Sequence, residues 1–461
     1  MRTVSKSIYC ILFLVLVSMP DWAKADELVR FNADEVSAMG TIIRSYQQGQ
    51  DVVCCNVPYS RPYFVMYDEG TTMLYALYVD MDTVADFEIY DDTVYFCGKK
   101  KSAVGGAAVM GFFDVASLMS MASANVAYLR VLPMESLDAI EVAVFSGRKH
   151  AVAIGAGLKD EAVVLDAVDE ATHWEMNFGK LDEGSYVLKD LAITREHVVV
   201  TARTANHVSA SYRGRLWYIK KPAATGGSLF PGTVEYDDLD SNLFLRDRFM
   251  IHSMGGDGFV TAFHAGLYVV GSNPFVVSFY NNITYGGSVV INESSPYPFE
   301  LGDIVSYDKS SQSVALLIYG RPDINSGVLY RSLIYEIPHS VPLPSFVSAH
   351  VYYGIYLSSL DLRHGISGLH FVAAGIQQPS TIGAQYTVKF RQGSFGGHCL
   401  YRNYNEIKDF GIDHDGDRHD IPLTKILQLP EEAMGDRKDM RVETLCNSLS
   451  DEIKQQKTMR I

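Results

Sequence analysis

The sequence predicts an all-β protein folded as a β-propeller of about seven four-stranded blades, with six or eight blades as alternatives. Three observations point to this fold. A short motif recurs every 50 to 57 residues, runs of β-branched and aromatic residues follow each copy, and helical periodicity is almost absent. Four short strands that repeat every 40 to 60 residues, roughly, are typical of a propeller blade, since each blade buries a face on its neighbour in a closed ring.

The recurring motif is an aliphatic residue, any residue and an aspartate, followed by apolar residues at alternate positions. Clear copies centre on Asp86, Asp190, Asp247, Asp303 and Asp409, and degenerate copies lie at Asp138 and Ser359. The successive separations are 52, 52, 57, 56, 56 and 50 residues. This regularity indicates an internal repeat rather than a chain of unrelated domains.

The run that follows each motif is apolar at consecutive positions, as in residues 93–98 (TVYFCG), 197–202 (HVVVTA) and 314–320 (VALLIYG). Such a strand is covered on both faces. A β-helix and a series of β-sandwiches are the alternatives. A β-helix turn uses roughly 20–30 residues and a sandwich about 100, so both fit the observed period less well.

This organisation resembles the broad class of bacterial secreted β-propellers that carry divergent blades. The resemblance covers roughly residues 55–413 and rests on the period and the strand pattern. The Gly-His and Trp-Asp marks of Trp-Asp repeats and the repeated double glycine of kelch repeats are absent. The resemblance therefore implies the fold and no residue-level function.

The N-terminus predicts export. Arg2 and Lys6 precede an apolar run over residues 8–17, and Ala23-Lys24-Ala25 is a small-residue cleavage site. This order is typical of a secretory signal peptide over residues 1–25, with an uncleaved anchor as the alternative. The apolar run is shorter than the roughly 20 residues of a membrane-spanning helix, and no later window combines that length with an absence of charge. We expect a periplasmic or extracellular protein with no transmembrane segment after signal removal.

The charge balance excludes some partners. The chain has 39 Lys and Arg against 54 Asp and Glu, a formal net charge of −15. Nucleic acids and anionic membranes are polyanions, so an acidic surface repels them. We expect no nucleic-acid partner, whereas binding of cations is compatible with this surface.

The predicted organisation has four parts. They are a signal peptide (1–25), a lead segment (26–53), the propeller (54–429) and a helical tail packed on the propeller (430–461). The tail is predicted helical because apolar residues recur at helical spacing from Val442 to Ile453.

We expect the ring to close by pairing of its N- and C-terminal strands. Residues 62–68 and 73–80 form a predicted hairpin ahead of the first motif copy, and the last copy, at 407–413, lacks a complete strand set after it. A blade shared between these segments would leave no open sheet edge.

The cysteines fit a link between the chain ends. Cys54 and Cys55 precede the N-terminal hairpin, and Cys399 and Cys446 lie in the C-terminal region. In an oxidising compartment these four are disulfide candidates, and a bridge across more than 300 residues would contribute about 4–5 kcal/mol in the chain-entropy treatment. The pairing is open, and thiols or a bridge within the C-terminal segment are the alternatives. Cys97, in a core strand, is expected to be a buried thiol.

One segment could bind a metal. Asp413, Asp415, Asp417 and Asp420 alternate in a short polar run. Alternating carboxylates suit Ca²⁺, which takes six to eight oxygen ligands. However, the glycine comes fourth rather than sixth, and no glutamate stands at position twelve. A solvated acidic turn is the alternative, and no other cofactor is indicated.

No catalytic motif is present. The thirteen histidines are scattered singly, and the chain lacks a His-Glu-x-x-His zinc segment, a Gly-x-Ser-x-Gly elbow and a phosphate-binding glycine loop. We therefore favour an exported binding or scaffold protein that presents a propeller face to a protein or carbohydrate ligand. The alternative is a propeller-type hydrolase or lyase acting on an extracellular polysaccharide or other polymer. Its carboxylates and histidines would converge at the channel from different blades. Neither the catalytic residues nor the oligomeric state can be assigned from the sequence.

Overall fold

The computed structural model describes residues 27–32, 40–47, 49–56, 61–68, 73–102, 105–119, 127–170, 173–182, 184–205, 213–223, 226–230, 232–239, 244–266, 273–293, 299–306, 313–320, 331–338, 348–353, 355–362, 371–377, 386–391, 412–413, 419–420, 432–434 and 436–446. The predicted signal peptide lies outside these residues. They form 32 strands and one short 3-10 helix, η2 (Val115–Leu118). Within this part of the chain, no helix has the length and apolar character needed to cross a bilayer.

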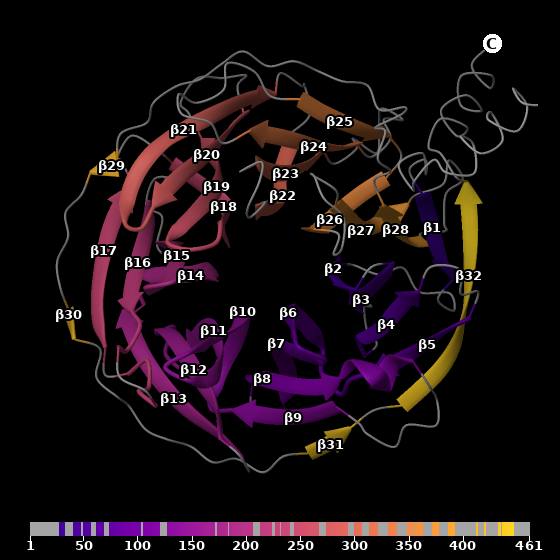
Figure 1. Cartoon of the computed structure of the whole chain (residues 1–461), viewed down its shortest axis with the longest axis horizontal. Coiled ribbons are helices and arrows are strands. Elements are labelled where there is room, and N and C mark those ends of the chain that lie inside the picture. The colour runs from indigo at the N-terminus through magenta and orange to yellow at the C-terminus, as the bar shows by residue number, and fades with distance from the viewer. Residues whose placement is uncertain are drawn as a thin grey trace, which may run out of the picture.

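The strands form six hydrogen-bonded sheets arranged about a central axis, which confirms the β-propeller (Figure 1). Five sheets, named B to F, each contain four consecutive antiparallel strands. Sheet B has β6 (Thr83–Tyr90), β7 (Thr93–Ser102), β8 (Gly105–Asp114) and β9 (Ala127–Leu132). Sheet C has β10 (Met134–Phe145), β11 (Arg148–Gly157), β12 (Ala162–Glu170) and β13 (His173–Asp182). Sheet D has β14 (Tyr186–Ile193), β15 (His197–Thr204), β16 (Gly214–Lys220) and β17 (Thr233–Leu239). Sheet E has β18 (Phe244–Ser253), β19 (Gly258–Gly266), β20 (Asn273–Asn281) and β21 (Thr284–Glu293). Sheet F has β22 (Phe299–Ser306), β23 (Ser313–Gly320), β24 (Arg331–Pro338) and β25 (Ser348–Tyr353).

The sixth sheet, sheet A, has nine strands and unites both ends of the chain. Its order is β2 (Gly40–Gln47), β3 (Gln50–Asn56), β4 (Tyr63–Asp68), β5 (Met73–Tyr78), β32 (Asp436–Cys446), β1 (Glu27–Asn32), β28 (Tyr386–Arg391), β27 (Phe371–Gln377) and β26 (Ile355–Leu362). The predicted count of seven separate blades is corrected to six sheets, which was one of the alternatives. The reason is that β32 pairs with β5 on one side and β1 on the other, so that two four-stranded sets become one sheet.

The C-terminal residues differ from the prediction. The described part of the predicted closing strand, β29 (Ile412–Asp413), pairs with β17 rather than with the N-terminal hairpin; residues 407–411 lie outside the described residues. β30 (His419–Asp420) also pairs with β17, and β31 (Glu432–Met434) pairs with β9. In the described residues of the predicted helical tail, β31 and β32 are strands instead, and residues 447–461 lie outside the described residues. Free main-chain groups at sheet edges outweigh the helical spacing of apolar residues in the tail. β1, β2 and most of β3, within the predicted lead segment, belong to sheet A.

The core lies between neighbouring sheets, and strands in the middle of a sheet contribute to two layers of it. On β11, Val152 and Ile154 pack with Val200 of sheet D. Their neighbours Ala151 and Ala153 pack on the opposite side with Cys97 of sheet B. All are buried, which confirms that consecutive apolar residues mark strands covered on both faces.

The repeated aspartate coincides with a β-bulge in the innermost strand of its sheet. The register shifts between Val84 and Asp86 in β6, and the same shift precedes Asp190 in β14 and Asp303 in β22. A bulge leaves one residue unpaired and re-aims the next side chain. The motif therefore directs its carboxylate toward the axis of the ring.

Strand β10 has a similar register shift between Leu137 and Ala139, and Gly155 of β11 pairs with Leu137 there, which allows the two backbones to approach closely. A Cβ added to Gly155 would lie 2.0 Å from the Ser136 carbonyl oxygen. We expect Gly155→Ala to lower the free energy of unfolding by about 1–3 kcal/mol, since the backbone must shift to admit the methyl group. Urea unfolding will measure this, with Gly258→Ala as the control because its added Cβ meets nothing closer than 3.5 Å. Equal stabilities of the two variants would contradict the prediction.

Candidate functional site

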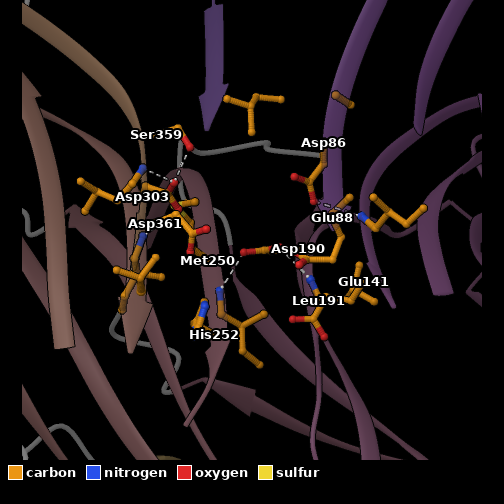
Figure 2. A pocket seen from close by; sticks show the side chains of 18 of the residues that line it. Asp86, Glu88, Glu141, Asp190, Leu191, Met250, His252, Asp303, Ser359 and Asp361 are labelled. Atoms are coloured by element: carbon orange, nitrogen blue, oxygen red, sulfur yellow. Dashed lines mark hydrogen bonds between the residues drawn. The ribbon is translucent and has the colours of Figure 1, made fainter. Parts of the chain in front are cut away.

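A cavity of about 630 Å³ lies where the innermost strands of the sheets meet. Seven carboxylates line it: Asp86, Glu88, Asp138, Glu141, Asp190, Asp303 and Asp361. Three basic side chains, Arg44, Lys189 and Arg248, and one histidine, His252, also line it. Figure 2 shows carboxylates entering this space from several strands. The convergence of acidic groups from different sheets, which the alternative catalytic hypothesis required, is therefore present.

Asp86 shows how the repeated aspartate is held. Its Oδ1 accepts a hydrogen bond from the Phe87 N–H at 2.8 Å, which stabilises the bulge. Its Oδ2 accepts from the Ile140 N–H of β10 at 3.1 Å. One carboxylate thus binds its own strand and the innermost strand of the next sheet.

The same arrangement recurs at two further copies of the motif. Asp190 accepts from the N–H groups of Leu191 and Ile251, both at 2.9 Å, and joins sheet D to sheet E. Asp303 accepts from the N–H groups of Ile304 at 2.9 Å and Leu360 at 2.8 Å, and joins sheet F to β26. The repeat seen in the sequence is therefore a repeated inter-sheet hydrogen bond.

Where no aspartate follows the bulge directly, other groups make the junction. After the degenerate copy at Asp138, Glu141 accepts the Ile193 N–H of sheet D. At the other degenerate copy, the Ser359 hydroxyl donates to Asp303 Oδ2 at 3.0 Å and accepts the Ile43 N–H at 3.3 Å.

Further hydrogen bonds join other neighbouring strands around the cavity. Asp361 accepts the Ser45 N–H at 2.6 Å and so joins β26 to β2, the two ends of sheet A. Between sheets E and F, Arg248 donates to the Gly302 carbonyl oxygen at 2.6 Å, and His252 Nδ1 lies 2.9 Å from the Ser306 hydroxyl. Burial lowers the pKa of His252, which favours the neutral ring.

Arg44 brings a positive charge to the carboxylates from β2. Its Nη2 donates to Asp86 Oδ1 at 2.8 Å, and its Nε lies 3.4 Å from Glu88 Oε2. Burial alone would lower the pKa of Arg44, but the surrounding carboxylates, Asp86 and Glu88 above all, outweigh it and raise the pKa. Arg44 therefore stays charged and neutralises part of the cavity.

Several carboxylates hold protons more tightly than usual. Burial, opposed by Arg44, raises the pKa of Glu88 to about 7. Burial and then the neighbouring charge of Glu88 raise the pKa of Glu141 to about 8. Burial is also the main cause of the raised pKa of Asp190 and Asp86. The cavity thus holds more carboxylates than its own cations neutralise.

The calcium-binding residues predicted from the sequence lie elsewhere. Asp413 and Asp420 belong to the short strands on the outer edge of sheet D, and Asp415 and Asp417 lie outside the described residues. The part of the chain that the structure describes has no group of three or more His, Cys, Asp or Glu side chains suited to a metal. The calcium site stays a prediction.

The predicted disulfides are not formed by the described N-terminal cysteines. Cys54, Cys55 and Cys97 are buried thiols, and burial raises the pKa of Cys54 and Cys97. Cys399 lies outside the described residues, and for Cys446 the structure describes only the β32 backbone. Successive residues of a strand face opposite sides, so Cys54 and Cys55 pack in different core layers.

No protein-family model and no curated protein matches the sequence. Among solved structures, the chain is similar to a family PL25 polysaccharide lyase, an ulvan lyase, at 10% identity over 81% of this chain and 96% of that chain, with a TM-score of 0.41. It is also similar to the β-propeller domain of the Trilobed protease from Pyrococcus furiosus (8% identity, 82% and 97% covered, TM-score 0.43). A third is the WD40 domain of SCAP from fission yeast (10% identity, 81% and 91% covered, TM-score 0.40). The arrangement of six sheets about an axis confirms the predicted resemblance to propellers with divergent blades at the level of architecture.

Proposed function

We propose that this chain is an exported binding protein that takes a small, positively charged ligand in its central cavity. The observation that carries the proposal is the lining of seven carboxylates against three basic side chains around about 630 Å³. Small-molecule sites typically enclose about 300–1,000 Å³. A cavity with excess negative charge and low-dielectric walls concentrates cations. The signal-like N-terminus supports export.

The state of the carboxylates favours a cationic ligand. The raised pKa values of Glu88 and Glu141 reflect burial of negative charge together with repulsion between neighbouring carboxylates. A cation placed among them would relieve both costs, as Arg44 does on its side of the cavity. The ligand would need several N–H donors, because charge-assisted hydrogen bonds to carboxylates are the strongest contacts available there.

The hydrogen bonding favours binding over catalysis. Asp86, Asp190, Asp303 and Asp361 each accept main-chain N–H groups at both oxygens. These four aspartates add negative charge to the cavity, but their oxygens are already occupied by main-chain hydrogen bonds that hold the fold together. Glu88 and Glu141 reach the cavity with fewer main-chain bonds, so they are the residues we assign to ligand contact.

Calorimetric titration with spermidine, arginine, glucose and glucuronate will test the proposal. We expect the cationic probes to bind with an affinity that falls with salt, and glucuronate not to bind. The double variant Glu88→Gln/Glu141→Gln should weaken spermidine binding by at least about tenfold. Glu135→Gln, an exposed residue of β10, is the matched control. Equal binding of all four compounds, no binding at all, or an unaffected double variant would contradict the proposal.

A second candidate is a hydrolase or lyase acting on an extracellular polymer. The observation in its favour is that Glu88 and Glu141, with pKa values of about 7 and 8, hold protons near neutral pH as a general acid must. Incubation of the purified chain with a panel of polysaccharides decides between the candidates. Turnover that is lost in Glu141→Gln but kept in Glu135→Gln would replace the binding proposal, whereas absence of turnover agrees with it.

A further inference from the structure

Glu88 and Glu141 lie on neighbouring innermost strands and are directed into the same cavity (Figure 2). The Glu141 carboxyl accepts the Ile193 N–H, so it is part of the junction between sheets C and D. Glu88 lies beside Arg44, which joins β2 to sheet B. Each glutamate is therefore tied to a contact between two sheets, and their charges share one cavity.

We propose that these two glutamates make the ring proton-dependent: while they are protonated the junctions among sheets A to D are tight, and loss of their protons loosens them. This inference concerns the protein without ligand and goes beyond the proposed function. Loosening would arise from repulsion between charges and from the cost of burying them, not from loss of the hydrogen bond itself.

Seven strands around the cavity contribute charged or titratable groups that face these glutamates or their neighbours. They are Arg44 on β2, Asp86 on β6, Asp138 on β10, Lys189 and Asp190 on β14, Arg248 and His252 on β18, Asp303 on β22, and Asp361 on β26. The carboxylates of Glu88, Asp190 and Asp86 act on Glu141. The Lys221 ammonium, just after β16, also acts on it, with the opposite sign. Arg44 is the basic group that acts on Glu88, where Asp361 and Asp86 oppose it. Deprotonation of the two glutamates therefore adds negative charge beside several carboxylates, and one cation opposes this at each glutamate, Arg44 at Glu88 and Lys221 at Glu141.

The direction of the pH dependence follows from proton linkage. The folded-state pKa values of about 7 and 8 lie above the ordinary value of 4.5 for a glutamate. Between these limits the folded chain binds more protons than the unfolded chain, so its stability falls as the pH rises. The contribution of the two glutamates to the folding stability is complete below pH 4.5. It is lost as the pH rises through about 7 for Glu88 and about 8 for Glu141. The junctions should thus be tighter in mild acid than in mild base.

Substitution of the glutamates by glutamine distinguishes the effect of the negative charge from the effect of the hydrogen bond. The amide oxygen of Glu141→Gln can still accept the Ile193 N–H, but the side chain has no proton to lose. We expect the melting temperature of the wild type to fall between pH 5 and pH 9, and that of Glu88→Gln/Glu141→Gln to fall much less over the same range. Glu135→Gln, exposed on the same strand as Glu141, should behave as the wild type does.

Amide hydrogen exchange of the wild type gives a readout that needs no variant. After correction for the intrinsic exchange rate, protection of the Ile140 and Ile193 amides should drop by about tenfold or more from pH 6 to pH 9. Central-strand amides such as that of Val152 should lose less. A double variant with the same pH profile as the wild type, or junction amides with pH-independent protection, would overturn the inference. Neither result would bear on whether a cation binds.

Discussion

Replacing Arg44 with methionine will destabilise the protein by about 2 kcal/mol, because the substitution leaves two partly buried carboxylates, Asp86 and Glu88, without their cation. The Arg44 side chain is 20% exposed and contacts Asp86 at 2.8 Å and Glu88 at 3.4 Å. Methionine keeps the length of the side chain and its packing near Phe87 while removing the charge. Urea unfolding at pH 7 measures the loss.

The loss should shrink in mild acid, where protonation of the carboxylates removes the charge that Arg44 neutralises. Arg195→Met is the control, since that side chain is exposed, and it should change the stability by less than about 0.5 kcal/mol. An Arg44→Met variant as stable as this control would show that the arginine does not fasten β2 to sheet B.

Replacing Asp166 with alanine will lower the free energy of unfolding by about 3–5 kcal/mol, because it disconnects a fully buried hydrogen-bond set. Asp166 and His150 are both 0% exposed, and His150 Nδ1 lies 2.8 Å from Asp166 Oδ1. Asp166 Oδ2 accepts the Leu229 N–H at 2.9 Å, from the connection between β16 and β17. One carboxylate on sheet C thus holds a connection of sheet D.

A double-mutant cycle will separate the two contacts of Asp166. His150→Phe preserves a ring that can stack on Phe145, whose centroid lies 3.6 Å from that of His150. We expect the two substitutions to be non-additive by at least about 1 kcal/mol, since each removes the same hydrogen bond. Glu196→Ala, at an exposed position, should have little effect. Strict additivity would mean that the pair is not coupled.

The repeat could be read from the sequence because one physical requirement recurs along it. The residue that follows each bulge must offer two side-chain oxygens to main-chain N–H groups. A short carboxylate side chain at a fixed position does this, as at Asp86, Asp190 and Asp303. The degenerate copies also have a physical reason. Asp138 occupies the bulged position itself, where the register skips from Leu137 to Ala139, and Glu141 makes the junction in its place.

The cavity could not be predicted residue by residue, because its members converge only in the closed ring. Arg44 lies outside every motif copy, in a segment expected to precede the propeller, yet it contacts Asp86 from 42 residues away. The strand pairing of the chain ends was even less accessible to prediction from the sequence. The pairing of β32 with β5 and β1 joins residues more than 350 positions apart, and local periodicity in the tail favoured a helix instead.

The short C-terminal strands also have a consequence for solubility. The outermost strands of a propeller expose rows of main-chain donors and acceptors, which are templates for intermolecular sheet growth and aggregation. β29 and β30 cover part of this row on β17, β31 covers part of it on β9, and β32 covers β5. A nascent chain that ends before Ile412 would present these rows uncovered. Protection from fibre-like association therefore arrives only once residues 412–446 have been synthesised.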